Sequence, residues 1–116
     1  MAWRVHARWG AFAWGVVAAF EAVVAYLSAA LPPERLSLVF AASAIVSLLA
    51  TVLLTRAPSA RVLLAATVWA GLNLVLGLWA MPVGAQDLRI PFALLVGAAG
   101  LASYRAWRGR RDQAGD

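Results

Sequence analysis

Four long apolar runs occupy almost the whole chain, and they constrain its fold more than any other feature. A helix of about 20 apolar residues is long enough to cross the hydrocarbon core of a membrane. The runs lack the alternation of β-barrel strands, so their backbone polar groups must be satisfied within helices. We therefore expect membrane-spanning helices at about 9–31, 36–55, 62–81 and 88–107.

The composition argues against a water-soluble domain. Of the 116 residues, 64% are hydrophobic and 13% are charged, whereas a soluble domain carries about 25% charged residues. A small soluble domain leaves much of its surface exposed and could not hide so much apolar area from water. Because the connections are short, each helix should run antiparallel to the preceding one. The sequence predicts an all-α integral membrane protein: one antiparallel four-helix transmembrane bundle over 1–116, with a disordered polar tail at 109–116.

Turn-forming residues separate the four runs. Pro32 and Pro33 end the first run, and Pro82 ends the third together with Gly84. Ser59 is placed to cap the N-terminus of the third helix. Pro91 suits the first turn of the last helix, where its missing N–H is not needed.

All ten basic residues are arginines, and they lie at the ends of the apolar runs. Residues placed in this way orient a chain in the membrane and contact anionic headgroups. One side holds only Arg35 and Arg89, and the other holds Arg4, Arg8, Arg56, Arg61, Arg105, Arg108, Arg110 and Arg111. The positive-inside rule then predicts a multi-pass protein of the inner cell membrane with both termini in the cytoplasm. The net charge of +5 does not predict a nucleic-acid partner, because no basic stripe or recognition motif is present.

The first run shares some features with a secretory signal. A basic start is followed by an apolar stretch and by the small residues Ser28, Ala29 and Ala30. The stretch is longer than an ordinary signal and contains Glu21. We expect it to remain as a span, with cleavage as the alternative.

Residues for most kinds of chemistry are absent. The chain has no Cys, which excludes disulfides and thiolate catalysis, and its single histidine is His6 in the basic N-terminal segment. A lone histidine makes no metal site. Since no nucleophile with an adjacent base and no phosphate-binding loop is present, we expect no enzymatic activity, no catalytic residues, no metal and no cofactor.

Glu21 is the most informative residue because it lies near the middle of its span. An ionised side chain at that depth costs about 3 kcal/mol or more. Ala18 and Ala25 lie within one turn of it on the same face, so we expect Glu21 to point into the packed interior. Ser47 and Asn73 fall at a similar depth, and Asn73 is the best candidate to hydrogen-bond the carboxyl, a contact worth about 1 kcal/mol.

Two interpretations of Glu21 stay open. In the first, a neutral carboxyl ties helices together or pairs with a basic residue of a partner. In the second, Glu21 takes part directly in handling protons or cations, as intramembrane carboxyls often do.

Small residues recur at helical spacing in every run, and such residues let membrane helices approach closely. We expect packing within the bundle at Ala18, Ala25, Gly77, Gly97 and Gly100. An alternative is that the face formed by Ala93, Gly97 and Gly100 packs against another subunit.

Three short motifs, together with the size and the lone Glu, resemble the small multidrug resistance transporters. Phe20-Glu21-Ala22-Val23 is similar to the Glu context of that family's first helix, and Trp69-Ala70-Gly71 to its Trp-x-Gly element. Gly84-Ala85-Gln86-Asp87-Leu88, followed by Pro91, is similar to the polar loop before its fourth helix. The resemblance implies a dimeric, proton-coupled exporter of cationic compounds, with Glu21 as the proton and substrate site and Trp69 lining the pocket.

The chain also departs from that family. Leu31-Pro32-Pro33-Glu34-Arg35 replaces the usual Lys and Ser-Glu-Gly pattern, and the second run contains no Tyr. The arginine bias is strong, whereas oppositely oriented subunits need nearly balanced loops.

Two function classes therefore stay open. One is an accessory or assembly subunit of a larger membrane complex, which acts through helix contacts with other subunits or as a homo-oligomer in the lipid bilayer. The other is a small proton-coupled transporter. Its candidate proton- and substrate-binding residues are Glu21, Asn73, Trp69 and Ser47. The sequence names no substrate, partner complex or oligomeric state.

Overall fold

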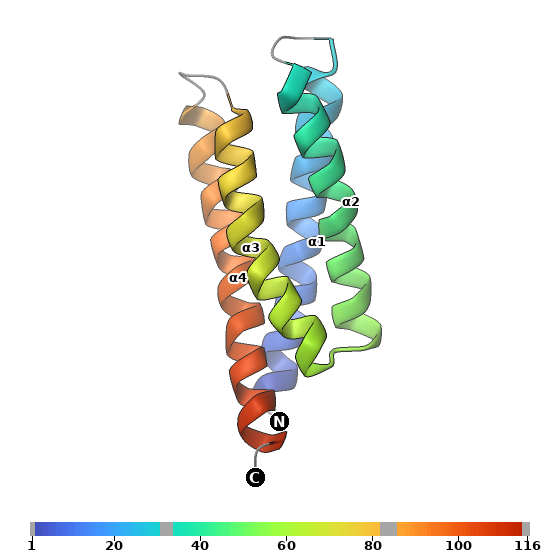
Figure 1. Ribbon diagram of the computed structural model, residues 1–116, viewed down its shortest axis with the longest axis vertical. Coiled ribbons are helices and arrows are strands. Elements are labelled where there is room, and N and C mark those ends of the chain that lie inside the picture. The colour runs from blue at the N-terminus through green and yellow to red at the C-terminus, as the bar shows by residue number, and fades with distance from the viewer. Residues whose placement is uncertain (1, 31–33, 82–85, 115–116) are drawn as a thin grey trace.

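Four long α-helices make up nearly all of the computed structural model, which describes residues 2–30, 34–81 and 86–114 (Figure 1). They are α1 (Ala2–Ser28), α2 (Glu34–Arg56), α3 (Ala60–Ala80) and α4 (Gln86–Ala114). Each is long and apolar enough to cross a membrane. The prediction of an all-α four-helix bundle is confirmed.

The helices pack as a closed ring. α1 contacts both α2 and α4, and α3 contacts α4, while the contact between α2 and α3 is the least extensive of the four. The bundle measures 52 × 22 × 17 Å, and both chain ends lie at the same end of it (Figure 1). Its long axis exceeds the roughly 30 Å of a bilayer's hydrocarbon core.

The outer surface is strongly apolar, and several polar side chains lie inside. Tyr26, Ile45 and Val75 are among the exposed large hydrophobic residues, whereas Glu21 and Asn73 are completely buried. A soluble protein rarely exposes apolar surface on this scale. This distribution is typical of a helix bundle in a lipid bilayer.

A cluster of aromatic rings fills the bundle between α1, α2 and α4. The Phe92 ring lies with its centroid 5.2 Å from that of Phe40 and 6.3 Å from that of Phe20. Phe92 reaches α3 at Gly77, where an added Cβ would collide with the ring. Gly77 is therefore the position at which α3 makes room for α4.

Both ends of the chain are more helical than the sequence suggested. α1 begins at Ala2, and α4 continues to Ala114, so 109–114 are helical where a disordered tail over 109–116 was expected. Residues 115 and 116 lie outside the described part of the chain. A Cβ at Gly109 would lie 2.8 Å from Cβ of Trp3, so these two helix ends touch. The guanidinium of Arg110 also lies 4.7 Å from the centroid of the Trp3 ring, a cation–π distance. These contacts hold the last turns of α4 against the start of α1.

The predicted helix signals have different outcomes. Ser59 caps α3 as expected, since its hydroxyl accepts a hydrogen bond of 3.2 Å from the Val62 N–H. Pro91 lies in the second turn of α4, not the first, because α4 already begins at Gln86. A proline there removes the N–H that would bond to the carbonyl of Asp87. The predicted turn residues Pro32, Pro33, Pro82 and Gly84 lie outside the described part of the chain.

Four of the five predicted packing residues lie against other parts of the bundle. Ala18, Ala25 and Gly77 are buried, and a Cβ at Gly100 would lie 2.7 Å from Cβ of Ala70. Gly97 is the exception: it is exposed, and an added Cβ would meet nothing within 4 Å. The inner face of α4 runs through Val96, Ala99 and Ser103, which turns position 97 outward.

The contact between α3 and α4 gives a stability prediction. In Gly77→Leu the new side chain meets the fully buried Phe92, and overpacking of this kind costs about 1–3 kcal/mol. Gly71→Leu on the same helix is the matched control, because position 71 is exposed with open space around it. Unfolding in mixed detergent micelles, followed by circular dichroism, should show a lower free energy of unfolding for Gly77→Leu and no change for Gly71→Leu. Equal stability of the two variants would contradict the packing described.

Candidate functional site

Glu21 lies inside the bundle, on the face of α1 that packs against α2. Its side chain is 0% exposed, and its Oε1 accepts a hydrogen bond of 2.7 Å from the Ser47 hydroxyl. The contact between α1 and α2 is the most extensive in the bundle. That packing brings the two side chains together although 26 residues separate them in the sequence.

Ser47 connects Glu21 to α3. Its Oγ also accepts hydrogen bonds from the Trp69 indole N–H at 3.2 Å and from the Asn73 amide at 3.4 Å. Trp69 and Asn73 are four residues apart, so their side chains lie one turn apart on the same face of α3. We call Glu21, Ser47, Trp69 and Asn73 the Glu21 cluster. It joins three helices and contains all four residues that the sequence singled out as proton- or substrate-binding candidates.

The local sequence explains why these side chains point inward. On α2 the buried residues include Ser43 and Ser47, which are small enough to let α1 approach closely. On α3 the buried residues recur every three or four positions, and Asn73 lies between Ala70 and Gly77 in that row. The polar groups therefore lie on the packed faces of helices that are otherwise apolar on all sides.

Two oxygens of the cluster have no hydrogen-bond partner among the described residues. They are Oε2 of Glu21 and Oδ1 of Asn73, and both are buried. An unpaired polar atom in an apolar interior is costly and uncommon. A proton on the carboxyl would turn one acceptor oxygen into a donor. The cluster therefore has capacity left for a proton or for a cationic group.

An apolar groove of 360 Å³ reaches the cluster from the outer surface between α2 and α3. These are the two neighbouring helices with the least contact. Trp69 lines the groove and also donates its indole N–H to Ser47 inside the bundle. The remaining lining consists of Val46, Leu49, Ala50, Leu53, Arg61, Val62, Ala65 and Ala66. Trp69 thus connects the apolar groove with the hydrogen bonds around the buried carboxyl.

A second buried polar contact was not anticipated from the sequence. The Trp14 indole N–H donates to the Ser103 hydroxyl at 3.0 Å, and that hydroxyl donates to the Ala99 carbonyl at 2.8 Å. Both Trp14 and Ser103 are completely buried, and they join α1 to α4. A serine near the end of the last apolar run was the available signal. Among the described residues, no group of three or more His, Cys, Asp or Glu is arranged to hold a metal ion.

Ser47 should contribute more to stability than another buried serine. Ser47→Ala removes the donor to Glu21 and the acceptor of two N–H groups, a loss of about 1–2 kcal/mol. Ser28→Ala is the matched control, because within the described part of the chain the Ser28 hydroxyl bonds only to carbonyls of its own helix. The free energy of unfolding in mixed micelles measures both. A larger loss for Ser28→Ala would show that the cluster does not hold the helices together.

Comparisons with known proteins give no match of any kind. No family model, no curated protein and no solved structure matches this chain. The resemblance to small multidrug resistance transporters therefore stays a prediction based on short motifs. Any function assigned to the chain must be argued from the Glu21 cluster and its surroundings.

Proposed function

We propose that this protein is a small proton-coupled membrane transporter in which the Glu21 carboxyl takes up and releases the proton. The observation that carries the proposal is the Glu21 cluster, a fully buried carboxyl held by Ser47 in the middle of an apolar bundle. Carboxyls inside membranes are expensive and are typical of proton relays and ion pathways. Three helices contribute to the cluster, so a change in its charge can act on the packing of all three.

Proton binding and substrate binding are coupled because both compete for the Glu21 carboxyl. A carboxylate in an apolar interior needs a proton or a counterion to offset its charge. A cationic substrate and a proton therefore exclude one another at Glu21, and each lowers the affinity of the other by the same factor. Uptake of the cation releases the proton, and return of the proton releases the cation.

The groove between α2 and α3 supports a lipophilic cation as the substrate class. Apart from Arg61, its lining is apolar and suits a molecule that enters from the lipid, and the Trp69 ring can add a cation–π attraction of about 0.5–2 kcal/mol. Passage from the groove to Glu21 requires Trp69 to move and the contact between α2 and α3 to open. Four helices enclose little space, so we expect a homodimer to form the complete pathway.

The arginine distribution supports an orientation in the membrane. We infer an antiparallel bundle in the inner cell membrane, with the chain ends and the α2–α3 connection in the cytoplasm. Eight arginines belong to that end, and Arg35 and Arg89 belong to the other. Cytoplasmic segments of membrane proteins carry such an excess of basic residues.

A second candidate function is an accessory or assembly subunit of a larger membrane complex. It is favoured by Gly71 and Gly97, two outward-facing glycines at which an added Cβ would meet nothing within 4 Å. Exposed glycines allow the helix of a partner to approach closely. In this case the Glu21 cluster would serve only to hold α1, α2 and α3 together.

The two candidate functions predict different results when proton release is measured on addition of a cation. Purified protein in detergent is mixed with a lipophilic cation such as tetraphenylphosphonium, and the protons released are measured near neutral pH. We expect wild type and Glu34→Gln to release protons and Glu21→Gln to release none. Glu34→Gln removes an exposed carboxyl at the start of α2 and controls for the loss of one acid.

The outcomes separate the candidates clearly. Release that depends on Glu21 supports the transporter. The transporter would be ruled out if the cation bound without proton release. It would also be ruled out if wild type released no protons while Glu21→Gln kept its helical content and stability. In that event, copurification of partner subunits with the intact chain becomes the next measurement.

The orientation has its own test, made simple by the absence of cysteine. Single cysteines are introduced as Glu34→Cys and Asp112→Cys, two exposed positions at opposite ends of the bundle. A membrane-impermeant maleimide added to intact cells or spheroplasts should label the first and spare the second until the membrane is permeabilised. The reverse pattern would refute the proposed orientation, and labelling of both would show mixed insertion.

A further inference from the structure

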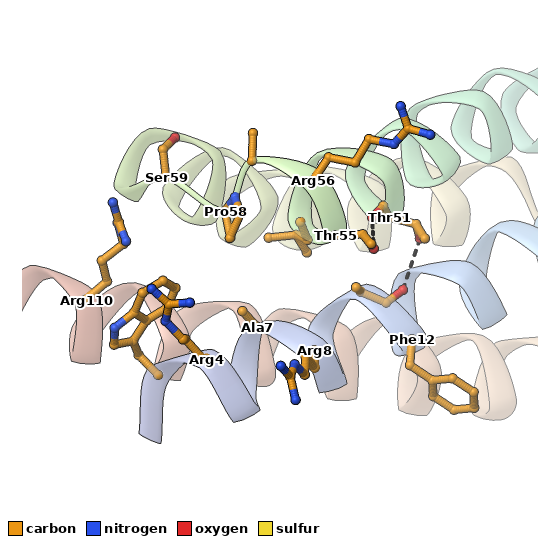
Figure 2. A pocket seen from close by; sticks show the side chains of 14 residues that line it. Arg4, Ala7, Arg8, Phe12, Thr51, Thr55, Arg56, Pro58, Ser59 and Arg110 are labelled. Atoms are coloured by element: carbon orange, nitrogen blue, oxygen red, sulfur yellow. Dashed lines mark hydrogen bonds between the residues drawn. The ribbon is translucent and has the colours of Figure 1, made fainter. Parts of the chain in front are cut away.

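A second hollow lies at the end of the bundle that carries the chain ends, and none of the four residues of the Glu21 cluster lines it. Its volume is 780 Å³. The first turns of α1, the end of α2 and the α2–α3 connection form its walls, and Arg110 reaches it from α4 (Figure 2). Elements distant in the sequence thus meet around one cavity.

The charged side chains among the described residues that line this cavity are all arginines. Arg4, Arg8, Arg56 and Arg110 line it, and no carboxyl is among the described lining residues. Arg110 extends towards the α2–α3 connection, whereas Arg8 and Arg56 point away at the rim (Figure 2). Since like charges held close together repel one another, the cavity favours an anion.

Two of these arginines converge on one aromatic ring. The guanidinium carbons of Arg4 and Arg110 lie 5.2 Å and 4.7 Å from the centroid of the buried Trp3 ring. Stacking on an indole restrains a guanidinium, so less freedom is lost when it binds an oxyanion. The N-terminus of α3 adds to the positive field, because Ser59 lines the cavity as its cap.

Apolar side chains make up much of the remaining wall along α1 and α2, among them Ala7, Ala11, Phe12 and Leu54. The hydroxyls of Thr51 and Thr55 also line it, and both already donate to backbone carbonyls. A soluble anion would leave this surface without a partner, whereas an acyl chain would cover it. The two parts of the cavity therefore match an amphiphile with an anionic head.

We propose that this cavity binds the phosphate group of an anionic phospholipid, with Arg4 and Arg110 at the phosphate and an acyl chain along the apolar wall. Arginine is well suited to phosphate, because its planar fork donates two parallel hydrogen bonds. The site lies at the arginine-rich end of the bundle, where the proposed orientation brings it to the anionic inner leaflet. This site rests on the cavity and on the proposed orientation, and it does not depend on Glu21.

The alternative is that the arginines attract lipid diffusely through their summed charge. A matched pair of double variants separates the two cases. Arg4→Gln with Arg110→Gln removes the two converging charges. Arg105→Gln with Arg108→Gln removes two exposed charges on the same end of α4 that do not line the cavity. Both double variants have the same net charge.

Native mass spectrometry of the purified protein in neutral detergent measures the bound lipid during titration with phosphatidylglycerol or phosphatidylcholine. Wild type should prefer phosphatidylglycerol. The first double variant should bind it roughly thirtyfold more weakly or worse, since two direct charge-assisted contacts to the phosphate are lost. The second should change by less than about threefold, the effect of screened, diffuse charge. Circular dichroism checks that both variants keep their helical content.

Three results would overturn the proposal. One is equal binding of the two lipids by wild type, which needs no variant. Another is an equal loss in both double variants, which would leave only diffuse attraction. The third is displacement of the lipid by inorganic phosphate in excess, which would make a soluble phosphate compound the ligand. Should the first double variant misfold, Arg110→Gln alone replaces it and is compared with Arg108→Gln.

Discussion

The hydrogen bond between Ser47 and Glu21 is the interaction on which the centre of the bundle depends. A carboxyl in an apolar interior is tolerated only when it is neutral or has polar partners. Ser47 provides one partner directly, and through the same oxygen it engages Trp69 and Asn73. The requirement to satisfy one acidic side chain thereby determines how α1, α2 and α3 face each other.

Packing divides the bundle into a tight side and a loose side. Where α4 meets α3, Gly77 admits the Phe92 ring and Gly100 lies against Ala70, so the backbones approach closely. Between α2 and α3 the contact is the least extensive, and a groove extends inward as far as Trp69. A ligand-dependent opening would begin most easily at this seam, because fewer apolar contacts must separate there.

How much of the site could be foreseen depends on the kind of information in each residue. Glu21 could be recognised from the sequence because it is a single acidic residue in an apolar run. Counting residues along the predicted spans places Ser47 and Asn73 at the same depth in the membrane as Glu21. Trp69 entered only through a resemblance. The contact of Trp14 with Ser103 was not foreseen. Nor was the convergence of Arg4 and Arg110 on Trp3. Trp14 with Ser103 and Trp3 with Arg110 are pairs from opposite ends of the chain, and no local pattern relates them.

The sequence by itself determined the four helices, the asymmetry of the arginines and the need of Glu21 for an interior partner. These follow from hydrophobic length and from the cost of burying charge, which are properties of each segment alone. Only the tertiary structure decided which way each helix turns about its own axis. Gly77 and Gly100 face inward, whereas Gly97 faces outward. The helices are apolar on all sides, so their periodicity cannot distinguish an outward-facing from a packed side, and contacts between distant residues make that choice.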